Sequence, residues 1–386
     1  MNWYMILPGG AGTFPADRSW IPALVRESLK EPVVIESADE LVPIHDAGLV
    51  FCLSIGDTGI LPAWLFMLQK IRRDPHFFEG CIATAVVDGS TEYYTKQVGR
   101  ELVFSANQAG CTFPGRPLTE GTGSLANYLV NARNWGLPLM DAYRRNLLEM
   151  LERQKTFAEQ YGRTFPSAYG EGMQTVGAEA GVSVKDAGAA IRRPRVLVLH
   201  ASIRSTSNTM RLWSMVREHL QEEMDIVEIS LRNGEIYDCG GCPFTMCMHF
   251  SEKGQCYYGG VIVEQVYPEV ENCDALVLLC PNYNDAVSAN ISAFINRLTA
   301  LYRRRQFYDK YLFGIIVSGY SGGDILARQL ISSLNMNKTF ILPPHFALLE
   351  TANDPGSILG IEGIEEKAEA YAENIRRTIQ GGFLKK

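Results

Sequence analysis

Residues 273–298 read CDALVLLCPNYNDAVSANISAFINRL, and this stretch decides the fold class. Residues 275–280 form a continuous apolar run of strand length, which is typical of a central strand buried on both faces of a parallel sheet. A polar loop follows at 281–284, and residues 288–298 then repeat apolar side chains with helical spacing. The order strand, polar loop, helix builds ligand crevices at the carboxyl ends of parallel strands.

Composition sets the size and class of the protein. The chain has 386 residues with 46% hydrophobic content, enough for two ordinary domains. A net charge of −7 and a pI near 5.5 argue against a nucleic-acid surface, which needs a concentrated basic face. The sequence has no membrane-length apolar run and no signal-peptide pattern. We therefore expect a cytoplasmic protein with no membrane partner, whose nine cysteines point to metal, redox chemistry or burial rather than disulfides.

Strands alternate with helices in two halves of the chain, which predicts an α/β protein with two doubly wound parallel sheets. Residues 1–161 form the first domain and residues 194–386 the second. Between them, residues 162–193 are rich in Gly, Ala, Ser and Val and are interpreted as a linker. Each half is expected to follow the flavodoxin-like plan with strand order 2-1-3-4-5. Short strands are predicted late in each half, at 112–113 and 339–341.

The two halves also align with each other. Residues 47–71 match 274–298 without a gap, and residues 99–102 occupy the place of 327–330. We interpret this as an internal duplication. The alternative is chance similarity between two α/β domains.

The first loop of the second domain concentrates hydroxyl and amide groups at the start of a helix. The strand RVLVLH leads into ASIRSTSNTMRL, which contains Ser202, Arg204, Ser207, Asn208 and Thr209. Backbone N–H groups, the helix dipole and hydroxyls together suit a terminal phosphate monoester. A GxGxxG dinucleotide motif is absent from this loop. Ordinary helix capping by one serine or threonine is the alternative.

Two further loops end the next strands of the second domain, and each contains one tyrosine. A flat ring over the sheet edge would fit such aromatic side chains, with glycines that allow close backbone approach. Either loop alone could be a surface turn. The candidate residues are Pro281, Asn282, Tyr283 and Asn284 in the second loop, and Ser318, Gly319, Tyr320, Gly322 and Gly323 in the third.

On these three motifs, residues 195–382 resemble the flavodoxin-like NAD(P)H-dependent FMN reductase superfamily, in particular its iron–sulfur flavoprotein branch. SIRSTSNT resembles the phosphate loop of that family, PNYNDAVSANISAFINRL its second segment, and SGYSGGD its third loop. The resemblance implies that the first loop holds the phosphate of FMN and that the other two flank the isoalloxazine. The chain departs from the family pattern at Ser292, where a lysine is usual, and at Asn296, where an aspartate is usual.

A cysteine-rich insertion spans residues 239–256. Cys239, Cys242, Cys247 and Cys256 could ligate a [4Fe–4S] cluster, and zinc is the less favoured alternative, with His249 as a substitute ligand. In the iron–sulfur flavoproteins that the chain resembles, the first three cysteines are more tightly spaced. The third alternative is that the thiols bind no metal.

The first domain lacks the hydroxyl cluster and the loop tyrosines, so we expect no FMN there. This half would instead cover the flavin of the other half, with Trp64, Tyr93 and Tyr94 as candidates to approach it. The resulting hypothesis is an FMN-dependent oxidoreductase that takes electrons from NAD(P)H and passes them through FMN, with or without an iron–sulfur cluster, to a quinone, a flavin or another acceptor, without a dedicated catalytic acid or base. The alternative is an iron–sulfur flavoprotein electron carrier without an NAD(P)H site. Partners are a small-molecule acceptor or a redox protein, and a homodimer is left open.

Overall fold

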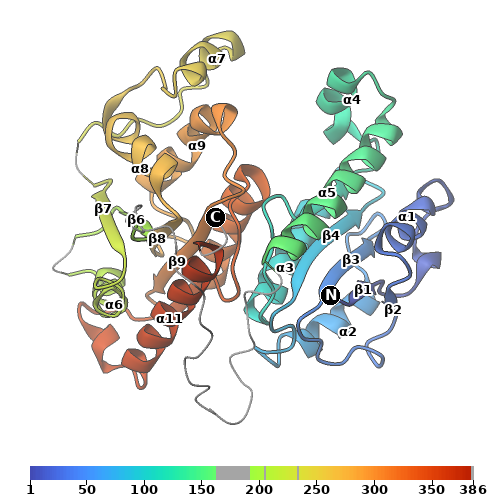
Figure 1. Ribbon diagram of the computed structural model, residues 1–386, viewed down its shortest axis with the longest axis horizontal. Coiled ribbons are helices and arrows are strands. Elements are labelled where there is room, and N and C mark those ends of the chain that lie inside the picture. The colour runs from blue at the N-terminus through green and yellow to red at the C-terminus, as the bar shows by residue number, and fades with distance from the viewer. Residues whose placement is uncertain (162–191, 204–205, 233, 384–386) are drawn as a thin grey trace, which may run out of the picture.

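The computed structural model describes residues 1–161, 192–203, 206–232 and 234–383, which form two α/β domains lying side by side (Figure 1). The predicted linker, 162–193, falls almost wholly outside these residues.

The first domain is a five-stranded parallel sheet of order β2-β1-β3-β4-β5. Its strands are β1 (Trp3–Ile6), β2 (Val33–Ile35), β3 (Gly48–Ser54), β4 (Ile82–Asp88) and β5 (Leu118–Gly121). Its α-helices are α1 (Trp20–Leu29), α2 (Pro62–Ile71), α3 (Thr95–Gln108), α4 (Leu129–Trp135) and α5 (Leu139–Tyr161).

The second domain repeats this topology with order β7-β6-β8-β9-β10, so the predicted fold class and strand order are confirmed. Its strands are β6 (Arg195–His200), β7 (Asp225–Ser230), β8 (Ala275–Pro281), β9 (Tyr311–Ser318) and β10 (Ala347–Thr351). Its α-helices are α6 (Asn208–Glu218), α7 (Phe244–Glu252), α8 (Tyr267–Asn272), α9 (Ala289–Arg304), α10 (Gly323–Leu330) and α11 (Ile364–Phe383). Short π-helical segments precede α8 (Ile262–Val266) and follow α10 (Ile331–Met336).

The central strands form as their apolar runs predict. In β8, every residue except the last is buried, and alternate side chains enter different cores: Leu276 and Leu278 point to one face and Val277 and Leu279 to the other. β3 is buried along its whole length in the same way. Helices therefore cover both faces of each sheet.

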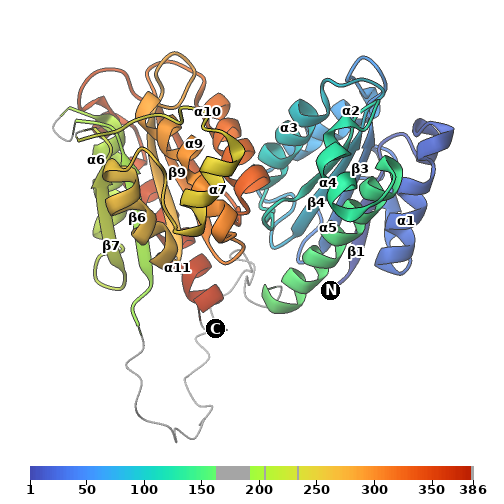
Figure 2. The same ribbon diagram turned by 90° about the horizontal axis from the view of Figure 1, so that it is seen from above.

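One hydrophobic core crosses the boundary between the domains. It joins the face of the first sheet covered by α2 and α3 to the face of the second sheet covered by α8, α9 and α10. Helices α3 and α10 contact each other in the middle (Figure 2). Across this contact, Glu101 of α3 pairs with Arg328 of α10, and within its own domain it also pairs with Arg72.

The last strands of both sheets lie later in the chain than predicted. The fifth strands are β5 and β10, whereas residues 112 and 341 make only isolated bridges to Ile82 and Tyr311. The segments expected to be strands instead meet each other across the domain boundary, where Phe113 and Leu342 form an antiparallel bridge. Each of these two residues donates its backbone N–H to the carbonyl of the other at 2.9 Å. These segments therefore keep a single bridge to their own sheet and add pairing across the domain boundary, while the fifth strand of each sheet forms later in the chain.

Within the part of the chain that the structure describes, no helix combines the length and the apolar character needed to cross a membrane.

Candidate functional site

The predicted site lies at the carboxyl edge of the second sheet. β8 pairs with β6 on one side and β9 on the other, so the loops that follow these strands are neighbours. Strands of both sheets run in the same direction in Figure 2, which places the carboxyl edges of the two sheets on one side of the molecule. The structure thus brings together the three predicted loops.

The first loop contains two serines that were predicted to bind a phosphate. Ser207 caps α6, and its Oγ accepts a hydrogen bond from the backbone N–H of Met210 at 3.3 Å. Ser202 is buried, and its Oγ has no hydrogen-bond partner among the described residues. A buried hydroxyl without a partner costs free energy that a bound acceptor or donor would recover. Thr209 is buried on the first turn of α6, and Arg204 lies outside the described residues.

Asn208 holds the first loop to the segment that follows β10. Its amide nitrogen donates to the carbonyl oxygens of Ala352 at 3.1 Å and Asp354 at 2.8 Å. Its amide oxygen accepts from the backbone N–H of Gly356 at 2.9 Å. The side chain is therefore committed to protein groups, and its contact with phosphate stays a prediction.

Asn282 connects the second loop to the third. Its amide nitrogen lies within hydrogen-bond distance of Asp285 Oδ1 at 3.1 Å, Ser318 Oγ at 3.3 Å and the Ser321 carbonyl at 2.8 Å. The amide oxygen accepts from the backbone N–H of Asp285 at 2.8 Å. Asn284 adopts a φ of 53°, in the left-handed region that asparagine tolerates. These contacts fix the two loops relative to each other.

The third loop needs its glycine at 322. Gly322 has a φ of +87°, and a Cβ there would lie 2.2 Å from Asp285 Oδ1. Gly322 also immediately precedes α10, which begins at Gly323. A backbone this close to the neighbouring loop leaves no room for a side chain.

Tyr283 and Tyr320 present aromatic rings at this edge. Their side chains are 55% and 82% exposed, so neither is used in the core. The hydroxyl of Tyr320 accepts a hydrogen bond from Asn353 Nδ2 at 3.3 Å. Exposed rings on adjacent loops can stack against a flat ligand.

Sequence reasoning missed two residues that support these loops, Asp285 and Gln329. Gln329 of α10 donates to the Asp285 carbonyl at 2.9 Å and accepts from the backbone N–H of Val287 at 3.2 Å. Asp285 directly follows the PNYN motif, so its place in the sequence could have identified it as a residue of the second loop. Gln329 lies near the end of α10, and nothing in its sequence context marks it as a loop contact.

The carboxyl edge of the first sheet is closed by its own side chains. Arg18 reaches from the segment after β1 to the Gly123 carbonyl at 3.4 Å, and its Nε lies 3.9 Å from Asp88 Oδ1. Tyr143 donates its hydroxyl to Asp88 Oδ1 at 3.2 Å, and Ser54 Oγ donates to the Thr13 carbonyl at 2.9 Å. Burial raises the pKa of Asp88 to about 6, although Arg18 and the Tyr143 hydroxyl oppose that rise.

Three aromatic residues of the first domain were candidates to approach the flavin. Trp64 is buried in the core at 5.9 Å from the Phe51 ring, so that expectation is wrong for Trp64. Tyr93 and Tyr94, which precede α3, are exposed.

The cysteine-rich insertion packs on α9 through α7 (Figure 1). Asp238, next to Cys239, accepts a hydrogen bond from Asn296 Nδ2 at 3.0 Å. Asn296, which replaces the aspartate usual in the family, therefore contacts the start of the insertion. All four cysteines are free thiols, with Cys239 exposed and the others half-buried. Among the described residues, no group of three or more His, Cys, Asp or Glu side chains is arranged to hold a metal ion. The structure therefore does not support the predicted iron–sulfur or zinc site.

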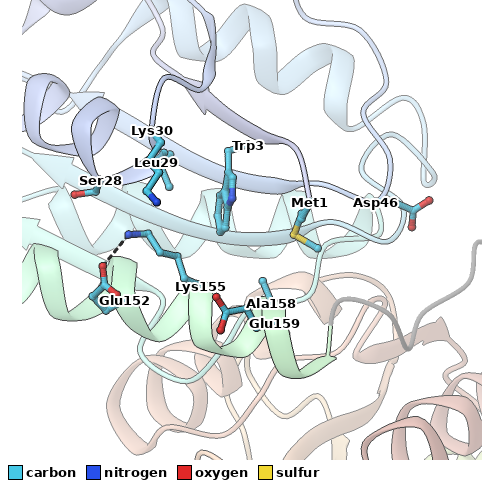
Figure 3. Close-up of a pocket in the computed structure, with 10 residues that line it drawn as sticks. All are labelled: Met1, Trp3, Ser28, Leu29, Lys30, Asp46, Glu152, Lys155, Ala158 and Glu159. Carbon is cyan, nitrogen blue, oxygen red and sulfur yellow. Dashed lines mark hydrogen bonds and ion pairs between the residues drawn. The ribbon is translucent and has the colours of Figure 1, made fainter.

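A cavity of about 670 Å³ lies in the first domain, away from the predicted loops (Figure 3). It is lined by Trp3 of β1, by residues at the end of α1, and by the last turns of α5, where Lys155 pairs with Glu152 at 2.7 Å. Its charged groups have both signs, so it offers no clear preference for a charged ligand.

Comparison with known proteins gives a family match in the second domain. Residues 194–354 match the family model of NADPH-dependent FMN reductase, which supports the predicted oxidoreductase class. No curated protein matches the chain.

Matches to solved structures cover about half of the chain. RosB with a bound flavin-phosphate intermediate is 15% identical, with a TM-score of 0.38, and the match covers 50% of this chain and 79% of RosB. A putative quinone reductase from Klebsiella pneumoniae is 16% identical, with a TM-score of 0.35 and coverage of 48% and 84%. An FMN-dependent NADH-azoreductase from Bacillus anthracis is 11% identical, with a TM-score of 0.32 and coverage of 47% and 99%.

Proposed function

We propose that the chain is an FMN-dependent oxidoreductase that binds one flavin at the carboxyl edge of its second sheet and takes electrons from NAD(P)H. The observation that carries this proposal is the buried Ser202 hydroxyl, which lacks a partner among the described residues beside the capped start of α6, within the segment that matches the reductase family. A bound phosphate would accept this hydroxyl's hydrogen bond and lie at the positive end of the helix dipole.

The proposal gives each loop a separate task. Ser202, Ser207 and Thr209 hold the phosphate together with backbone N–H groups of α6. Arg204, which lies outside the described residues, is assigned there from its sequence position alone. Asn282 and Gly322 hold the second and third loops in place, while Tyr283 and Tyr320 contact the ring system. Bound FMN would supply the redox chemistry, accepting hydride from NAD(P)H and passing two electrons to a quinone, a flavin or another acceptor.

In this proposal the first domain binds no flavin and packs against the flavin-binding domain. Its own sheet edge is occupied by Arg18, Asp88 and Tyr143, which contact one another there. The domain contacts α10, whose Gln329 holds the Asp285 loop. Through α10 and Gln329, the first domain therefore helps to hold the second loop in place.

Anaerobic reduction of the FMN-loaded protein separates an enzyme from an electron carrier. We expect NADPH or NADH to bleach the flavin absorbance within a stopped-flow experiment. Bleaching by dithionite alone would instead identify a carrier without an NAD(P)H site. A protein that cannot be loaded with FMN would contradict the proposal.

The iron–sulfur cluster takes no part in the proposed electron path, because the described cysteines do not form a ligating group. Iron and acid-labile sulfide analysis of anaerobically purified protein tests this point directly. About four iron atoms per chain would show that the insertion closes around a cluster.

A further inference from the structure

Four cations gather where the two domains meet at the amino-terminal edges of the sheets. Arg116 precedes β5, Lys338 lies just after the π-helical end of α10, Arg303 is near the end of α9, and Arg153 is on α5. The ring of Tyr302 lies between them: the Arg116 guanidinium is 5.6 Å and Lys338 Nζ 5.5 Å from its centroid. Residues from both domains therefore contribute to one positive patch, called the seam patch here.

These cations have no carboxylate within ion-pair distance among the described residues. By contrast, cations nearby are paired: Arg145 with Glu149, and Arg305 with Asp309, both at 2.9 Å. Arg153 Nε is buried and has no hydrogen-bond partner in the described part of the chain.

Like charges this close raise the free energy of the unliganded protein. The pKa of Lys338 is lowered by burial and further lowered by Arg116 and Arg303. The chain has a net charge of −7, yet no described carboxylate lies within ion-pair distance of these four cations. An anion bound at the seam patch would relieve this repulsion.

An apolar groove of about 650 Å³ adjoins the seam patch. Pro114, Leu148 and Phe157 line it together with the ring of Tyr308, over which the Arg153 guanidinium lies at 5.9 Å from the centroid. Two carboxylates also line it, and each is already paired with another cation: Glu149 with Arg145 at 2.9 Å and Glu152 with Lys155 at 2.7 Å. Arg153 thus belongs to both the groove and the patch. A volume of this size suits a nucleotide-sized molecule.

We propose that this seam binds an organic phosphate of nucleotide size. Its phosphate lies among Arg116, Arg153 and Lys338, and its aromatic or apolar body lies in the groove against Tyr308. The site is separate from the flavin loops, because its segments precede the strands of the two sheets whereas the flavin loops follow them. Ligand contacts to both domains would also strengthen their association.

Isothermal titration of the full chain with ADP and, separately, with inorganic phosphate tests the proposal. We expect saturable ADP binding that weakens about tenfold in the double variant Arg116→Gln/Lys338→Gln. The conservative variant Arg116→Lys/Lys338→Arg should retain binding, which separates loss of charge from loss of folding. Arg377→Gln, which removes an exposed and paired charge on α11, should bind as the wild type does.

Two further variants locate the ligand. Tyr308→Ala should weaken ADP while leaving inorganic phosphate unchanged, because the ring contacts only the organic body. Ser207→Ala, at the flavin phosphate loop, should leave ADP binding intact whether or not the protein binds FMN. The proposal is overturned if ADP shows no saturable binding, if Ser207→Ala abolishes that binding, or if Arg116→Gln/Lys338→Gln leaves it unchanged.

Discussion

Asn107 and Asn335 occupy equivalent positions in the two halves of the chain, and each binds the backbone of the opposite domain. Asn107 Nδ2 donates to the Pro343 carbonyl at 2.6 Å, and Asn335 Nδ2 donates to the Pro114 carbonyl at 3.1 Å. Each lies eight residues after the aligned glycine or alanine of its helix, Gly99 and Ala327. The domains therefore meet with approximate two-fold symmetry, as two copies of one fold would.

Both asparagines are fully buried, so replacing either with alanine should destabilise the boundary between domains. Asn107→Ala and Asn335→Ala each leave buried backbone carbonyls without a donor, and we expect a loss of about 2–4 kcal/mol. Urea unfolding followed by fluorescence measures this. The exposed Asn337→Ala is the matched control and should change stability by less than about 0.5 kcal/mol. Equal unfolding midpoints for Asn107→Ala and this control would show that the boundary does not depend on the buried amide.

Ser202→Ala should separate ligand binding from protein stability. Because its hydroxyl has no partner among the described residues, its removal should leave the unfolding midpoint of the FMN-free protein unchanged or slightly raised. FMN affinity should fall about tenfold through loss of one hydrogen bond to a charged group. Quenching of flavin fluorescence measures the affinity. Ser214→Ala, which removes a hydroxyl bonded to the Met210 carbonyl further along α6, should leave FMN affinity unchanged.

Asp88 should make the protein less stable as pH rises from about 4 to 6. Its pKa is about 6 in the folded protein, against 3.8 for an unperturbed aspartate, so the folded state holds the proton over this range. Folding is therefore favoured at low pH, and the contribution of about 3 kcal/mol is lost as pH passes the folded pKa. In Asp88→Asn this part of the pH dependence should disappear from urea unfolding curves. Asp39→Asn, at an exposed carboxylate that does not act on Asp88, should keep the wild-type profile. If Asp88→Asn also keeps the wild-type profile, the assignment is refuted.

The nine cysteines should divide into two classes of thiol. Cys52, Cys81, Cys111, Cys273 and Cys280 are buried, and burial raises the pKa of each. The four cysteines of the 239–256 insertion are exposed or half-buried. A chromogenic thiol reagent should therefore modify four thiols quickly in the native protein and all nine after unfolding. If those four thiols are protected until a chelator is added, they ligate a metal and the present description of the insertion is wrong.

The sequence predicted the sheets because their central strands are long apolar runs with strong periodicity. It misplaced the fifth strands, since nothing local distinguishes residues 112–113 and 339–341 from edge strands of their own sheets, and the bridge that forms between Phe113 and Leu342 depends on the other domain. The three flavin loops were found because hydroxyl groups, tyrosines and glycines are themselves local signals. Supporting contacts such as Gln329 to Asp285 depend on helix packing and could not be anticipated from spacing alone.

The most direct test of the account is the number of FMN molecules bound by the full chain, measured by titration of FMN-free protein and equilibrium dialysis. The account predicts one per chain, weakened about tenfold by Ser202→Ala and unchanged by Ser19→Ala at the corresponding helix start of the first domain. Binding of two FMN molecules, of none, or of one that depends on Ser19 rather than Ser202 would contradict it.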